Sequence, residues 1–208
     1  VTIDYWGFLS NFSAAQLAAI TPAALANITA AQVTGVYSVH YPMKAETLAA
    51  LGPNIAGLSD SALGAIRGYD GSTVGGQALA YNQVLSAEQV TALGSKIGSL
   101  NTDAIANLSI SAVGALSATQ VDALTGPQVQ ALGDRVSGLS AAAVGSLDAT
   151  QLAAVTIDYW GFLSNFSAEQ LAAITPAALA NITAAQVTGV TDVHYPMKAA
   201  TLAALGPN

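Results

Sequence analysis

The chain repeats one eight-residue pattern of polar and apolar positions. Each unit opens with Ser, Thr, Asp or Asn, often has Gln at its fourth position, and has apolar residues at its fifth and eighth. Residues 117–124 form a complete unit, with Gln120 in fourth place and Val121 and Leu124 as the apolar pair. Residues three apart lie on one face of an α-helix. The pattern therefore predicts a short helix with one buried face in each unit.

The first and fourth positions of the unit match a helix capping box. The side chain of the first residue accepts a hydrogen bond from the backbone three residues on, and Gln reaches back to the backbone of the first. A β-solenoid with eight-residue rungs is the alternative, but Ala, Gln and Leu fill the units and favour helix. The predicted capping pairs are Ser13/Gln16, Thr29/Gln32, Ser86/Gln89, Ser117/Gln120, Thr125/Gln128, Asp148/Gln151, Ser167/Gln170 and Thr183/Gln186.

A helix of this length has under two turns and needs neighbours. Isolated helices shorter than about 12–15 residues are marginal in water. We therefore expect an all-α solenoid, or superhelix, of very short helices stacked on one another. Leu-Gly pairs begin at Leu51, Leu93 and Leu132, and Gly after a last core Leu is a helix-ending signal. These pairs mark the expected corners, and their spacing implies about five helices per coil.

A longer repeat is superimposed on the short one. Residues 1–54 recur as 155–208, at an offset of 154 residues. We therefore expect residues 1–154 to be one complete long repeat and residues 155–208 to be the first third of the next. The two copies differ at four positions only, which are Ala15/Glu169, Tyr37/Thr191, Ser38/Asp192 and Glu46/Ala200.

The composition narrows the classes of partner. Only 8% of the residues are charged, and the net charge is −7. Nucleic-acid binding needs clustered cations and is not expected. Insertion into a membrane is not expected either, because polar residues interrupt every apolar run. So few charges give weak protection against association, which favours packing of the chain with copies of itself. A soluble solenoid surfaced with Ser, Thr, Asn and Gln is the alternative.

The candidate contact residues lie in three stretches. Residues 37–43 and 67–85 interrupt the eight-residue pattern, and residues 1–12 consist of an aromatic unit, 2–9, followed by a spacer at 10–12. Their aromatic residues either fill the core where the pattern is broken or form a lateral contact that recurs every 154 residues. The candidate lateral contact residues are Tyr5, Trp6, Phe8, Phe12, Tyr37, His40, Tyr41, Tyr69 and Asp70.

No stretch of the sequence matches a catalytic or cofactor motif. Residues 68–76 are turn-rich, and residues 77–84 are compatible with a helix. Asp70 beside Gly71 is similar to part of a calcium loop, but calcium needs six to eight oxygen ligands and only one carboxylate is present. His40 lacks the partners of a metal site. The chain has no cysteine, so thiolate sites are excluded. We expect no cofactor and no enzymatic activity.

The run 116–124, Leu-Ser-Ala-Thr-Gln-Val-Asp-Ala-Leu, resembles the L[ST]xxQ[VL]xAL arrays of very large bacterial surface and secreted proteins, adhesin-like and haemolysin-like proteins among them. The resemblance implies an exported, repetitive, non-enzymatic protein, extracellular or at the cell surface. We expect a structural segment that forms fibres, filaments or a sheath by self-association. Two alternatives stay open: an adhesin stalk that presents a binding domain outside this segment, and a ligand- or cation-binding module that uses residues 67–85.

The long repeat makes a prediction about the full protein. Because residues 205–208 repeat residues 51–54, we expect Ile-Ala-Gly-Leu, as in residues 55–58, or a close relative, to follow Asn208. The sequence of the complete gene, or the mass of the intact native protein, tests this. A native chain of only 208 residues would contradict it.

Overall fold

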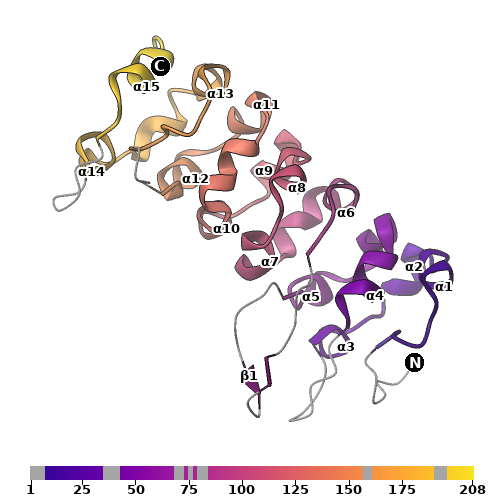
Figure 1. Ribbon diagram of the computed structural model, residues 1–208. Coiled ribbons are helices and arrows are strands. Elements are labelled where there is room, and N and C mark those ends of the chain that lie inside the picture. Colours follow the sequence, from indigo (N-terminus) through magenta and orange to yellow (C-terminus); the bar gives the residue numbers. More distant parts are fainter. Residues whose placement is uncertain are drawn as a thin grey trace. The chain divides into compact units, whose positions relative to one another are not determined.

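Helices make up most of the regular secondary structure in the described chain. The computed structural model describes residues 8–34, 43–67, 73–74, 77–78, 84–156, 161–189 and 196–208. Within these ranges the α-helices have four to seven residues, and four 3-10 helices lie among them (Figure 1). The predicted all-α fold of helices with under two turns is confirmed.

The chain divides into two compact units, Val1–Ala112 and Val113–Asn208. The boundary falls inside α8 (Ile110–Gly114), whereas the long sequence repeat begins again inside the second unit. The first unit contains α1 (Ala14–Ala18), α2 (Pro22–Leu25), α3 (Ala30–Thr34), α4 (Ala45–Ala50), η1 (Gly52–Gly57), α5 (Asp60–Leu63), α6 (Ala87–Leu93), η2 (Gly94–Ser99) and α7 (Thr102–Ala106). The second contains α9 (Ala118–Asp122), α10 (Gly126–Leu132), η3 (Gly133–Gly138), α11 (Ala141–Val144), α12 (Ala149–Ala154), α13 (Ala168–Ala173), η4 (Ala178–Asn181), α14 (Ala184–Thr188) and α15 (Ala199–Ala204).

Capping boxes begin the helices where the sequence predicts them. At α9 the Ser117 N–H donates to Gln120 Oε1 at 3.1 Å, and the Gln120 N–H donates to Ser117 Oγ at 3.3 Å. In all eight predicted pairs the Gln side chain accepts from the backbone of the capping residue. The boxes satisfy backbone N–H groups that a short helix leaves unpaired, and they are confirmed at every predicted position.

The Leu-Gly pairs are sharp turns, as predicted. Gly52, Gly94 and Gly133 have φ of +53°, +52° and +53°, and each begins a 3-10 helix. This left-handed conformation costs glycine nothing, but costs other residues about 1–2 kcal/mol. Leu9 and Leu163, the same position in the two long copies, adopt it with φ of 62° and 59°. Positive φ therefore occurs at both glycine and leucine in this fold.

The fourth-position glutamines have a second role that the eight-residue pattern does not reveal. Besides its capping bond, Gln89 Nε2 donates to the Leu48 carbonyl at 2.8 Å, and Gln151 Nε2 donates to the Val121 carbonyl at 2.8 Å. Both side chains are buried. The oxygen of each amide therefore accepts the capping hydrogen bond at the start of its own helix. The nitrogen donates to a carbonyl of a segment much earlier in the chain. Both polar atoms of the buried amide have a partner as a result.

One local prediction is wrong. Residues 77–84 were compatible with a helix, but Gln77–Ala78 is strand β2 and pairs antiparallel with β1 (Thr73–Val74), in the register Thr73 to Ala78 and Val74 to Gln77. The sequence carried the signal, because a Gly-Gly dipeptide between two short segments is typical of a two-residue hairpin. Residues 79–83 lie outside the described part of the chain.

Close packing of η1 on α2 predicts a position that rejects any side chain. A Cβ on Gly57 would lie 2.1 Å from the Pro22 carbonyl oxygen, so Gly57→Ala should lower the free energy of unfolding by about 1–3 kcal/mol. Gly126→Ala is the matched control, because its Cβ would meet only ordinary contacts at 3.5 Å or more. Urea unfolding followed by circular dichroism tests both variants. Equal stabilities would contradict the close approach.

Candidate interaction surfaces and a small pocket

Only two of the nine candidate contact residues lie in the described part of the chain. They are Phe8 and Phe12. The predicted lateral cluster therefore stays a prediction, and the structure does not bring its members together or separate them. Tyr5, Trp6, Tyr37, His40, Tyr41, Tyr69 and Asp70 lie outside the described residues.

The two phenylalanines differ in their surroundings. Phe8 is buried, as is Phe162 at the same position of the second copy. Its ring is part of the core, so it offers no surface for a lateral contact. Phe12 is 40% exposed, whereas Phe166, its counterpart, is 6% exposed. The two copies share their local sequence, so the difference in exposed fraction must come from the residues that pack against each copy.

A face of the second copy is covered by the segment before it. Helix α13 packs against α11, and Gln170 Nε2 donates to the carbonyls of Ser137 at 3.0 Å and Leu139 at 2.6 Å. Gln170 is buried as a result, but its counterpart Gln16 in α1 is exposed. We call the corresponding surface of the first copy the N face. Each residue of the N face is more exposed than its counterpart in the second copy. The N face consists of Phe12, Gln16, Ile20 and Ala24.

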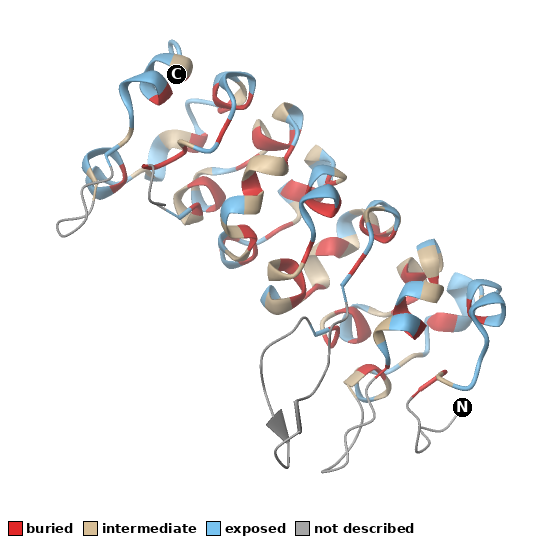
Figure 2. Ribbon diagram, viewed as in Figure 1, coloured by how far each residue is buried: buried red, intermediate tan, exposed pale blue. Residues whose placement is uncertain are grey.

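A second face shows the reverse relation. Leu48 and Val33 of the first copy are 1% and 0% exposed. Their counterparts Leu202 on α15 and Val187 on α14 are 61% and 45% exposed, and Figure 2 shows both helices as largely exposed. We call Val187 and Leu202 the C face. In the first copy, later residues of the chain cover these two side chains. In the second copy, the same two side chains are exposed.

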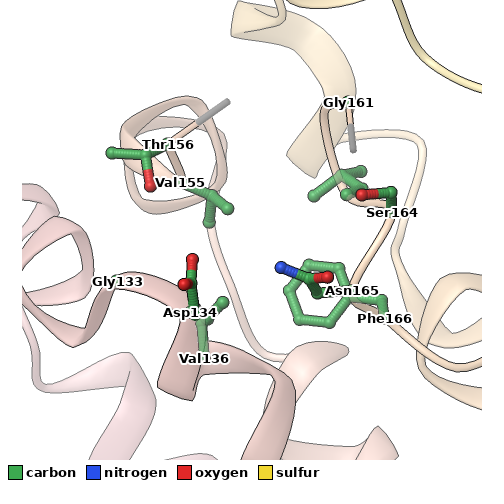
Figure 3. A pocket seen from close by; sticks show the side chains of 10 residues that line it. Gly133, Asp134, Val136, Val155, Thr156, Gly161, Ser164, Asn165 and Phe166 are labelled. Atoms are coloured by element: carbon green, nitrogen blue, oxygen red, sulfur yellow. The ribbon is translucent and has the colours of Figure 1, made fainter. Parts of the chain in front are cut away.

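One small pocket lies in the second unit, between η3, the segment after α12 and residues 161–166 (Figure 3). Its empty volume is about 270 Å³, part of it open solvent. The Asn165 carboxamide points toward the Asp134 carboxylate across the hollow, and the Phe166 ring forms a wall. The pocket is lined by Gly133, Asp134, Val136, Val155, Thr156, Gly161, Leu163, Ser164, Asn165 and Phe166.

The polar side chains of this pocket can form hydrogen bonds. It offers one carboxylate, one carboxamide and the hydroxyls of Thr156 and Ser164, which can hold water or a small polar molecule. Among the residues that the structure describes, no group of three His, Cys, Asp or Glu side chains could hold a metal ion. Sequence reasoning missed the pocket because segments about 30 residues apart form it.

Within the described ranges, the residues flanking the strand pair include one ion pair. Arg67 Nη1 lies 3.1 Å from Asp103 Oδ2, and both side chains are 40% exposed or more. An ion pair so open to water contributes at most about 1 kcal/mol. It ties the beginning of the 67–85 stretch to α7, but it does not form a binding site.

No protein-family model matches the chain, and no curated protein matches it. Among the described residues, no helix is both long and apolar enough to cross a membrane.

The two copies provide a matched test of the second role of glutamine. Gln170→Glu keeps the oxygen that accepts from Ser167 but loses the donor to Ser137 and Leu139 and buries a carboxylate, so the free energy of unfolding should fall by about 2 kcal/mol or more. Gln16→Glu makes the same change on the exposed N face and should alter stability by less than about 0.5 kcal/mol. Urea unfolding measures both. Equal losses would mean that capping alone explains the glutamine.

Proposed function

We propose that this chain is a structural segment of a large extracellular repeat protein that forms fibres, filaments or a sheath by self-association. The observation that carries the proposal is that buried Gln side chains bind backbone carbonyls of a segment 30 to 41 residues earlier at several places along the chain. A sequence whose units each bind an earlier unit in the same way is suited to extended stacking rather than to a closed globule.

The proposed architecture is a solenoid of eight-residue units with about five helices per coil. Its support is a set of side-chain hydrogen bonds that join residues 30–41 positions apart. Residues with positive φ recur at Leu9, Gly52, Gly94, Gly133 and Leu163, at intervals of 43, 42, 39 and 30 residues. The bonds are Asn54 to Ala18, Gln89 to Leu48, Asn101 to Gly64, Gln151 to Val121 and Gln186 to Ala153.

Self-association is supported by the surface chemistry. Charged residues make up 8% of the chain, so few like charges oppose contact between copies. Large apolar side chains stand on this surface, including Ile110 and Leu202, each 61% exposed. The resemblance to arrays in bacterial surface proteins supports an extracellular location. The same features suit an adhesin stalk, which would carry a separate binding domain and would not assemble.

The oligomeric state of the purified chain distinguishes a fibre-forming segment from an adhesin stalk. We expect light scattering to rise with protein concentration, and electron microscopy to show ordered filaments. Because the proposed contacts are apolar, the assembly should persist or increase in about 1 M salt, where charge attraction is screened. Isolated particles at every concentration would favour the stalk. Assembly that dissolves in salt would contradict apolar contact.

The alternative of a ligand-binding module has its own test. If residues 67–85 bind a ligand, deletion of 68–76 should abolish that binding. For the structural role we expect the deletion to leave assembly intact, because residues 68–76 lie outside the eight-residue units that stack in the proposed architecture. If the deletion abolished assembly but left the helix content unchanged, residues 68–76 would form the contact between copies.

A further inference from the structure

We propose that a two-point contact determines which segments of this chain pack together. One point is a side chain that donates hydrogen bonds to two carbonyls of an earlier segment. The other is a glycine at the sixth position of an eight-residue unit, which a carbonyl of the later segment approaches closely. The inference rests on the proposed stacked architecture and names the residues by which each segment recognises its partner.

The first compact unit contains this contact between η2 and an earlier segment. Lys96 Nζ donates to the carbonyl of Ala56 at 2.8 Å and to that of Leu58. Three residues after the lysine, the Ser99 carbonyl oxygen lies where a Cβ on Gly64 would be only 3.1 Å from it. This glycine follows the acceptor Leu58 by six residues.

The second compact unit contains the same contact with different residues. Gln170 Nε2 donates to the carbonyls of Ser137 at 3.0 Å and Leu139 at 2.6 Å. Three residues after the glutamine, the Ala173 carbonyl oxygen would lie 3.0 Å from a Cβ on Gly145. Gly145 again follows the acceptor Leu139 by six residues. An ammonium group and an amide therefore occupy equivalent places, and the glycine is common to both contacts.

A third glycine is approached in the same way. A Cβ on Gly114 would lie 3.2 Å from the carbonyl oxygen of Gly138, and Arg135 stands three residues before Gly138. The three approached glycines occupy the sixth position of units that begin with Ser and have a buried Ala, in place of Gln, at the fourth. Units that donate through a long side chain are thus distinct from units that accept a close backbone.

The glycines provide space and are not needed for their backbone conformation. Gly64 and Gly145 have φ of −63° and −65°, which are ordinary α-helical values. Alanine is more favourable than glycine at such a position, because it has less backbone freedom to lose on folding. The carbonyl oxygens at 3.0–3.1 Å from the built Cβ atoms explain why glycine is present instead.

The donor side chain alone does not select the place of contact. Several units present carbonyls that a donor binds: Gln151 Nε2 donates to the carbonyls of Val121 and Leu124, and Gln186 Nε2 donates to that of Ala153. A contact held by the donor only could shift by one eight-residue unit and find similar acceptors. In a chain of similar units such shifted pairings are close in energy to the native one.

The length of chain between partners does not select the place either. The glycine and the residue whose carbonyl approaches it are 35, 24 and 28 positions apart in the three contacts. A shift of α13 by one unit would bring the Ala173 carbonyl from Gly145 to Ala153, the sixth residue of the next unit, where a Cβ is present. The glycine therefore holds the packed segments in one register.

Alanine substitution tests the need for space. Gly145→Ala should raise the equilibrium constant of unfolding of the full chain by about tenfold, measured by urea unfolding. Gly126→Ala is the control, because it makes the same change in helix α10, where the nearest atoms would lie 3.5 Å or more from the Cβ. If both variants were as stable as each other, the close approach would have no energetic role and the proposal would fail.

A cysteine pair tests the register itself, because the chain contains no cysteine. Ala153→Cys with Ala173→Cys should stay reduced, since a disulfide needs Cβ atoms about 3.5–4.5 Å apart and the pair comes that close only in the shifted register. Adding Gly145→Ala should raise the yield of this disulfide at least about fivefold, and adding Gly126→Ala should not. Mass spectrometry of the oxidised chain measures the yield.

Two results of the cysteine experiment would overturn the proposal. A high disulfide yield with Gly145 in place would show that the segments meet in more than one register. An unchanged yield with Gly145→Ala, together with lower stability, would make the glycine a packing position only. Both experiments use the chain at low concentration and are decided whether or not copies assemble, so they are independent of the test of filament formation.

Discussion

The structure depends on a side-chain amide that bonds at both ends. In a helix of five or six residues, most backbone groups have no partner within the helix. The oxygen of the fourth-position Gln pairs with the N–H at the beginning of its own helix, and in the covered helices the nitrogen pairs with a carbonyl of an earlier segment. A hydrophobic residue could fill the same space, but it would leave both backbone groups unpaired in a buried place. Local helix formation and packing against the earlier segment are thereby coupled through one residue.

The elements that the sequence predicts correctly are those whose cause is local. A capping box is complete within four residues, so Ser117 and Gln120 predict the beginning of α9 without knowledge of the rest. The turn at Gly94 is likewise visible, because glycine after a core Leu is suited to positive φ. The pairing of β1 with β2 joins residues that are equally close in sequence. The sequence does not predict it unambiguously, because helix-forming Gln77 and Ala78 follow directly on the Gly-Gly turn signal.

The features that the sequence does not predict need a partner from far along the chain. Nothing near Gln170 indicates that its nitrogen binds the carbonyl of Leu139, 31 residues earlier. The positive φ of Leu163 has no composition signal, because leucine is not a residue that favours it. The same is true of the pocket around Asp134 and Asn165, and of Phe12, which the sequence cannot distinguish from Phe166. For these residues the surroundings decide, and they lie outside any local window.

The amide that binds backward has a consequence for how stability is distributed. Some segments donate hydrogen bonds from their glutamines to an earlier segment and also accept hydrogen bonds at their own carbonyls from a later one. Such a segment is stabilised by two neighbours. A segment that makes only one of these sets of bonds is less stable and opens first. Hydrogen exchange would therefore be slowest in the middle of a stack and fastest at its margins, even where the sequences are the same. In such a chain the free energy of opening a given helix depends on its position among the packed segments. Adding neighbours strengthens helices whose own residues have not changed.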